Sequence, residues 1–192
     1  MLLAMKVDAG SGLTCPYLSA ASPKSSSVGP GELEPVLVRL LTELKDRLRD
    51  RLLGVVLFGS AARRQARAGS DVDVLVVVEQ SGLASDLEVT AACTRTEAST
   101  EYEDFRSRHT AMPIVSVVAD SGKLRANPLI LLDMLDEGVI LHDPAGVMRD
   151  LFERLRTRLE ALGAKKVRLE HGRWMWFLKP DWRPSEVVEV GL

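Results

Sequence analysis

The chain has few cysteines and histidines, which removes several classes of site from consideration. Its two cysteines, Cys15 and Cys93, have no metal-ligand spacing and no disulfide framework. We therefore expect two unpaired thiols in a reducing, cytoplasmic environment. The three histidines are scattered along the sequence and form no metal-binding cluster.

Long hydrophobic runs and a strong excess of charge are also absent. No apolar run approaches the length of a membrane span, and the start MLLAMKVDAG lacks the basic lead and apolar core of a signal peptide. The net charge is −2, so the overall charge does not indicate direct nucleic-acid binding. With 192 residues, 46% of them hydrophobic, the chain has the length and composition of one soluble domain plus an appendage.

Hydrophobic periodicity divides the chain into three parts. Residues 1–29 include the Ser- and Pro-rich stretch SAASPKSSSVGP and are predicted to be a disordered tail. Residues 30–144 are predicted to form the main domain, and residues 145–192 a C-terminal helix plus a β-hairpin. The predicted elements are helix 33–51, strand 55–58, helix 61–66, strand 72–78, polar helix 84–108, strand 112–119, helix 128–138, strand 139–142, helix 147–162 and a hairpin turning at 171–172. This order predicts an α/β (α+β) fold with helices packed on a small mixed β-sheet.

The most informative segment is GVVLFGSAARRQARAGSDVDVLVVVE, residues 54–79. An apolar run stops at Gly59-Ser60, and a second apolar run begins at Asp71 and Asp73. Residues two apart on a strand project to the same face, so these carboxylates would lie side by side. They repel each other, and a divalent cation that prefers oxygen ligands is the simplest counter-charge. A Gly-Ser turn before a helix offers backbone N–H groups to a phosphate. Together they indicate a nucleoside triphosphate bound with Mg²⁺.

This segment resembles the signature of the minimal nucleotidyltransferases, a family in the DNA polymerase β-like superfamily. The signature is a strand, Gly-Ser, a short helix containing Arg, and Asp-x-Asp on the next strand. The matching residues are Gly59, Ser60, Arg63, Ser70, Asp71 and Asp73. The family usually has Gly after the Arg, where this chain has Arg64. The resemblance implies the polymerase β-like nucleotidyltransferase fold.

The resemblance also implies roles for these residues. Asp71 and Asp73 would be catalytic and would bind Mg²⁺, which supports transfer of a nucleotidyl group. The nucleotide, ATP or another NTP, would be bound by Gly59, Ser60, Arg63 and Ser70. Gly59 would let the backbone approach the phosphate, and Arg63 would offer a forked, permanently charged contact.

A third catalytic carboxylate, which the superfamily usually takes from a neighbouring strand, has no clear occupant. The centre of strand 112–120 is Ser116, and Asp120 lies four residues further on. Three alternatives remain open. Asp120 is the third catalytic residue, or Glu103 or Asp104 reaches in from the preceding helix, or the third carboxylate is absent.

The small size of the chain resembles that of stand-alone minimal nucleotidyltransferases, whose genes often pair with HEPN-domain proteins. The implied function is transfer of AMP from ATP to an acceptor hydroxyl, such as a tyrosine of a HEPN-type toxin, with this chain as antitoxin. A homo-oligomer is compatible with this. The alternative is a catalytically inert module that binds a nucleotide or a partner. An antibiotic-modifying transferase would need a larger C-terminal part than residues 145–192.

All three tryptophans of the chain fall in one span of nine residues in the predicted hairpin region. They are Trp174, Trp176 and Trp182. The favoured interpretation is a strand packed on the preceding helix. A partner surface comes second, because tryptophans anchor interfaces. A base-stacking platform comes third.

Overall fold

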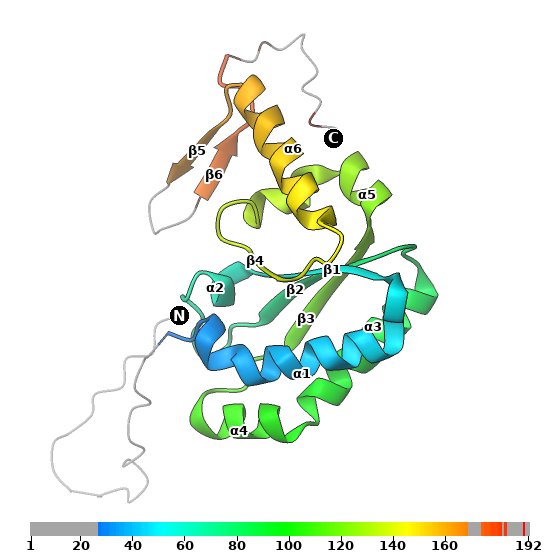
Figure 1. The fold of residues 1–192 in the computed structure, drawn as a ribbon. Coiled ribbons are helices and arrows are strands. Elements are labelled where there is room, and N and C mark those ends of the chain that lie inside the picture. Colours follow the sequence, from blue (N-terminus) through cyan, green and yellow to red (C-terminus); the bar gives the residue numbers. More distant parts are fainter. Residues whose placement is uncertain (1–26, 169–173, 182, 184–189, 191–192) are drawn as a thin grey trace, which may run out of the picture.

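A four-stranded mixed β-sheet is the centre of the molecule. The computed structural model describes residues 27–168, 174–181, 183 and 190. The sheet has the order β3-β2-β1-β4, in which β2 and β3 are parallel and the other two pairs are antiparallel (Figure 1). Its strands are β1 (Leu52–Phe58), β2 (Val72–Val78), β3 (Ile114–Asp120) and β4 (Val139–His142). The predicted fold class, a small mixed sheet with helices packed on it, is confirmed.

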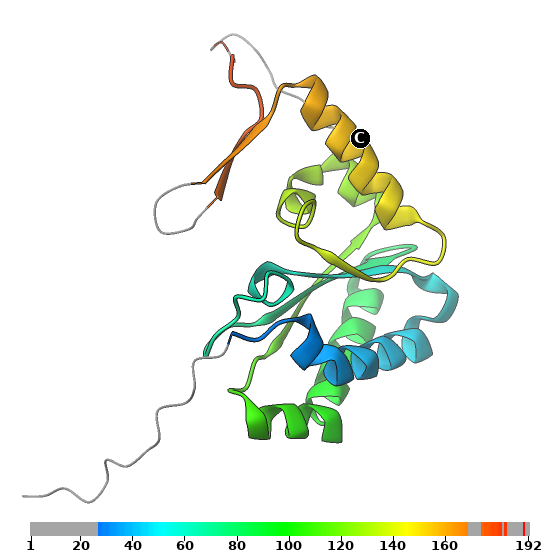
Figure 2. The same ribbon diagram turned by 60° about the vertical axis from the view of Figure 1, so that its left-hand side comes forward.

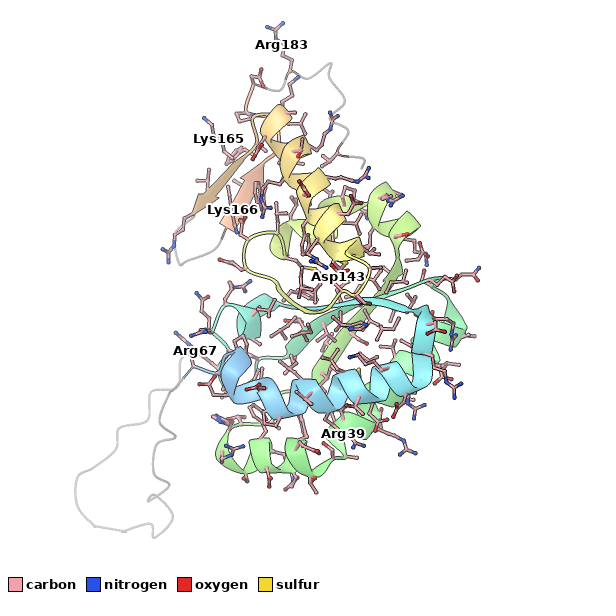
Figure 3. All side chains as sticks on the ribbon, in the orientation of Figure 1. Arg39, Arg67, Asp143, Lys165, Lys166 and Arg183 are labelled. Carbon is pink, nitrogen blue, oxygen red and sulfur yellow. The ribbon has the colours of Figure 1, made fainter. Side chains whose placement is uncertain are left out.

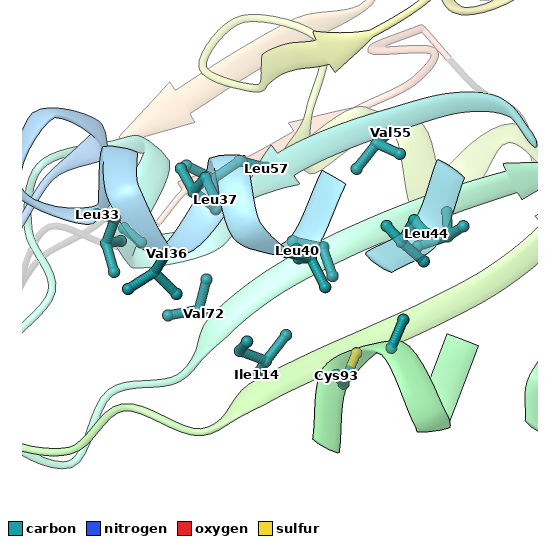
Figure 4. Packing of buried hydrophobic residues seen from close by; sticks show 14 of the residues in the cluster. Leu33, Val36, Leu37, Leu40, Leu44, Val55, Leu57, Val72, Cys93 and Ile114 are labelled. Atoms are coloured by element: carbon teal, nitrogen blue, oxygen red, sulfur yellow. The ribbon is translucent and has the colours of Figure 1, made fainter. Parts of the chain in front are cut away.

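One face of the sheet is covered by helices α1 (Pro30–Leu48) and α3 (Leu83–Glu97), with α4 (Thr100–Arg108) beside them. Helix α1 begins at Pro30, and the backbone N–H of Gly29 donates to Glu32 at 3.0 Å, which caps the first turn. The buried leucines and valines of α1 pack on the alternate valines of β1 and β2, Val55 and Val72 among them (Figure 4). This face therefore holds the larger part of the core.

The opposite face is covered by α6 (Val147–Ala161), with α5 (Ser121–Ala126) and the 3₁₀ helix η2 (Pro128–Asp133) beside it (Figures 1 and 2). A separate two-stranded hairpin, β5 (Lys165–Arg168) and β6 (Trp174–Phe177), follows α6. Trp176 packs against the core on this side of the sheet. The remaining elements are α2 (Gly59–Ala62) and the 3₁₀ turn η1 (Arg49–Arg51). None of the helices in the described part of the chain has the length and hydrophobicity that a transmembrane span needs.

Four local predictions differ from the structure. The predicted helix 61–66 is the shorter α2, and residues 63–66 are not helical. The polar helix 84–108 is two helices, because Ser99 ends the run and caps α4 by accepting from the backbone N–H of Tyr102. The predicted helix 128–138 is only a 3₁₀ turn, and α5 before it was not predicted. Most of the predicted N-terminal tail, residues 1–26, lies outside the described residues. Val28 is buried and bridges to Ala66, so the described fold begins earlier than residue 30.

Candidate active site

Gly59 links the turn after β1 to the carboxylate of β2. It has a φ of 71°, in the left-handed region that favours glycine. A Cβ on Gly59 would clash with the Oδ2 of Asp73. Any other residue at position 59 would force the Asp73 carboxylate to turn away from this position. Glycine is therefore required here on two grounds, its conformation and the space that Asp73 leaves.

Asp71 and Asp73 lie together at the start of β2. Asp73 is half-buried, while Asp71 is exposed and directly precedes the strand. The pKa of Asp73 is raised, first by desolvation and then by the negative charge of Asp71, and the positive charge of Arg63 opposes the rise. The structure thus brings the two predicted carboxylates together with Arg63. It creates a local excess of negative charge that a cation would relieve.

The two predicted serines flank this pair. Ser60 is half-buried in α2, and its carbonyl accepts from the backbone N–H of Gln65 at 2.9 Å. The hydroxyl of Ser70 accepts from the backbone N–H of Arg67 at 3.0 Å, and the backbone N–H of Ser70 donates to the carbonyl of Arg67 at 2.9 Å. Ser70 therefore closes the turn that delivers Asp71. Nucleotide binding by Ser60 and Ser70 stays a prediction.

The two consecutive arginines after α2 point to different parts of the molecule. The backbone N–H of Arg63 donates to the carbonyl of Gly59 at 3.3 Å where α2 ends, and the charge of Arg63 acts on Asp73. Its Nη1 lies 3.8 Å from Oε2 of Glu137. Arg64 instead packs against Gly29, and its charge acts on Glu32 at the start of α1.

Arg64 has a φ of 58°, the left-handed conformation that glycine adopts most easily. This is the position where the minimal nucleotidyltransferases usually carry glycine. The backbone of this chain therefore adopts a conformation that suits glycine, although the residue is arginine.

The structure does not bring Asp120 to the pair. In the parallel register of β2 and β3, Asp120 lies opposite Val78, five residues beyond Asp73 and therefore about 16 Å along the strand. Its parity also places it on the opposite face of the sheet. The Asp120 carboxylate accepts from the backbone N–H and the hydroxyl of Ser81 and from the backbone N–H of Lys123, where it caps α5. These hydrogen bonds hold the pKa of Asp120 down to about 2.

No other described residue takes the place of a third carboxylate. The register places Val115 opposite Asp73, so Val115 and Val117 are the β3 residues on the Asp73 face. Ser116 points to the other face, where it interacts with Cys93. Glu103 and Asp104 lie on α4, which covers that other face, and Glu103 pairs with Arg106. Within residues 27–168 and the other described positions, no three His, Cys, Asp or Glu side chains are arranged to hold a metal.

The two carboxylates of Asp71 and Asp73 still fit a Mg²⁺ ion that is bound together with substrate phosphates. Mg²⁺ in proteins is commonly held by one or two carboxylates together with substrate phosphates and water. Asp71 and Asp73 supply two carboxylates at a point where negative charge is already unfavourable. This set suits Mg²⁺ that arrives with a nucleotide better than Mg²⁺ held by the protein alone.

The position of Trp176 agrees with the interpretation that the tryptophan segment is a strand packed on the preceding helix. Trp176 is half-buried against the core beneath α6, and Nζ of Lys166 lies 5.8 Å from the centroid of its ring. Trp182 and the side chain of Trp174 lie outside the described residues.

Comparison with known proteins agrees with the motif. Residues 37–115 match the family model described as a nucleotidyltransferase domain. The matched region runs from α1 into β3, and so includes Gly59, Asp71 and Asp73 and stops before Asp120. This part of the chain is therefore similar to a nucleotidyltransferase domain, in agreement with the motif.

Solved structures with similar folds are more distant. One is a toxin–antitoxin complex with AMP-PNP, 13% identical, with a TM-score of 0.46, covering 66% of this chain and 88% of that chain. A second is the tri-AMPylated HEPN toxin in complex with its MNT antitoxin from Shewanella oneidensis, 14% identical, with a TM-score of 0.39, covering 67% and 93%. A third is the structure of a protein from Sulfolobus solfataricus that was assigned as a nucleotidyltransferase. It is 18% identical, with a TM-score of 0.32, and the match covers 60% of this chain and 90% of that chain. The search of curated proteins found no match.

Proposed function

We propose that the protein is a metal-dependent nucleotidyltransferase that moves AMP from ATP to an acceptor hydroxyl. The observation that supports this most is the packing of Gly59 against Asp73, with Asp71 and Arg63 alongside. This arrangement combines a close backbone approach for phosphate, a paired carboxylate site and a guanidinium. A surface turn with solvated aspartates would need none of them.

The chain's own residues divide the work as follows. Asp71 and Asp73 would hold Mg²⁺, which when bound supplies charge neutralisation and orients the phosphates. Arg63 would contact the phosphates, and Gly59 and Ser60 would give the triphosphate a close backbone approach. The acceptor oxygen attacks the α-phosphorus, the bond to the bridging oxygen breaks, and pyrophosphate leaves. The acceptor's proton passes to solvent.

The acceptor we propose is a tyrosine hydroxyl of a HEPN-type toxin partner, with this chain as its antitoxin. A phenol has a pKa near 10 and loses its proton more readily than an aliphatic alcohol. That property suits a site in which β3 presents valines where a third carboxylate would stand. The partner itself follows from the resemblance to the minimal nucleotidyltransferases.

The test is transfer of label from ATP. The purified protein is incubated with Mg²⁺, α-labelled ATP and candidate HEPN-domain proteins. Mass spectrometry then locates any added AMP. The Asp71→Asn/Asp73→Asn variant is the control. No transfer from any NTP, together with no nucleotide binding, would refute the proposal.

A second candidate is an inert module that binds the nucleotide without turnover. Val115 and Val117 on the Asp73 face favour it, since neither can activate a nucleophile. Calorimetry with ATP and Mg²⁺, run beside the transfer assay, separates the two. Tight binding without transfer to any acceptor would identify the inert module.

A further inference from the structure

Arg63 lies between two acidic groups that come from different parts of the chain. On one side is the pair Asp71 and Asp73, in which the positive charge of Arg63 lowers the pKa of Asp73. On the other side is Glu137, in the turn between η2 and β4. The sheet explains this meeting, because Val139 of β4 pairs with Leu57 of β1. Residues just before β4 therefore lie beside the residues just after Phe58.

The turn that carries Glu137 is held on several sides. Met134 and Leu135 are buried, and the backbone N–H of Gly138 donates to the carbonyl of Met134 at 2.8 Å. A Cβ on Gly138 would lie only 2.5 Å from that carbonyl oxygen, so glycine is needed for the tight turn. Arg156 of α6 donates to the carbonyl of Leu135 at 3.2 Å. Glu137 is therefore presented from a well-anchored position.

The same turn is tied to the C-terminal hairpin. Nζ of Lys166 lies 2.9 Å from the Asp136 carboxylate, the neighbour of Glu137. Figure 3 shows Lys166 on the hairpin, which stands beside α6 above the sheet. One turn thus contacts the candidate site, α6 and the hairpin through three consecutive residues, from Leu135 to Glu137.

We propose that Glu137 is a positioning residue, which holds the Arg63 guanidinium beside the Asp71 and Asp73 pair instead of on it. The proposal rests on the proposed nucleotidyltransferase function. Without Glu137, Arg63 would keep its attraction to Asp73 and lose the opposing one, so it would move onto the carboxylate that the cation needs. With Glu137, Asp73 stays open and the guanidinium faces the incoming phosphates.

The geometry of the ion pair supports this role over a purely structural one. At 3.8 Å the contact is electrostatic and too long for a hydrogen bond, so the donors of the guanidinium remain available for phosphate oxygens. The side chains of Arg63 and Glu137 are 28% and 31% exposed. They are therefore partly desolvated yet accessible to a ligand.

The test is a double-mutant cycle on nucleotide binding and turnover. Glu137→Gln is expected to weaken binding of ATP with Mg²⁺ about fivefold and to raise KM by a similar factor, with little change in kcat. In an Arg63→Gln background the same change should have no effect, because its target is gone. Glu79→Gln, an exposed carboxylate at the far end of β2, is the matched control and should match the wild type. Melting temperatures show whether each variant folds.

The outcomes separate the two proposals. If the wild type binds and transfers nucleotide but Glu137→Gln behaves like the wild type, the positioning role is wrong and the function stands. Equal losses in the wild-type and Arg63→Gln backgrounds would also contradict the positioning role. If the wild type binds no nucleotide, both the function and the role of Glu137 are refuted.

Discussion

Asp73 and Asp120 stand at opposite ends of the same pair of strands, and their surroundings shift their pKa values in opposite directions. Asp120 accepts hydrogen bonds from Ser81 and Lys123 and has a pKa of about 2. Asp73 is partly desolvated beside another negative charge, and its pKa is raised. The first carboxylate has its partners within the chain. The negative charge of Asp73 is only partly balanced within the chain, which is typical of a site that binds a ligand.

The largest effect is expected from Asp73→Asn. Transfer should fall by about 10³-fold, because several kcal/mol of transition-state stabilisation depend on the metal that this carboxylate holds. The variant should nevertheless melt at a higher temperature at neutral pH, by about 1–3 °C, because a desolvated, repelled charge is removed. Label transfer and calorimetric melting measure the two effects.

The pH dependence of this gain follows from the sign of the shift. Because the pKa of Asp73 is higher in the folded than in the unfolded chain, its ionisation costs stability as the pH rises through the folded value. The advantage of Asp73→Asn should therefore disappear below about pH 4, where both states are protonated. A lower melting temperature for the variant at neutral pH would contradict this account of Asp73.

A second, somewhat smaller effect is expected from Gly59→Ala. The new Cβ would meet Asp73 in a backbone region unfavourable to alanine, so we expect about 10²-fold slower transfer and about 1–3 kcal/mol lower stability. Gly163→Ala is the matched control, since Gly163 also has a positive φ but no atom near its Cβ. A control that lost as much transfer would show that strain alone is responsible.

Val115→Asp tests whether the site can be completed. The new carboxylate would stand opposite Asp73 on the same face, and Val115 is 42% exposed, so the charge can be accommodated. We expect affinity for Mg²⁺ in the presence of nucleotide to rise about tenfold, which is about 1.4 kcal/mol. Val115→Asn supplies a neutral side chain of the same shape. An equal rise in both variants would exclude a charge effect.

The smallest effect on transfer is expected from Asp120→Asn, which should leave kcat and KM near the wild-type values. Its stability should fall at neutral pH, because Asn cannot offer Ser81 and Lys123 a charged acceptor. The Asp120 contribution is present above pH 4 and is lost as the pH falls through about 2, so the two melting curves should converge in acid. A large loss of transfer would restore Asp120 as a catalytic candidate.

The sequence predicted the sheet, the first helix and the residues that meet around Gly59, because these depend on local periodicity and a short motif. The arrangement around β3 could not be predicted in the same way. Which of Val115 and Ser116 shares the Asp73 face depends on the register with β2, and that register is set by packing across the whole sheet.

Glu137 could not be found from the sequence for a related reason. It is 74 positions after Arg63 and belongs to no motif, and only the pairing of β1 with β4 brings the two together. Arg64 shows the reverse case. The family pattern has glycine at this position, and the arginine of this chain has the left-handed conformation that glycine adopts most easily.

The bridge between Val28 and Ala66 has a practical consequence for anyone shortening the protein. The backbone N–H of Val28 donates to the carbonyl of Ala66 at 2.9 Å, and both side chains are buried. Ala66 lies midway in the loop from Arg63 to Ser70, so this contact halves the length of loop that is free to move before Asp71. A version trimmed to residue 30 would keep every candidate ligand and still release the loop that presents them.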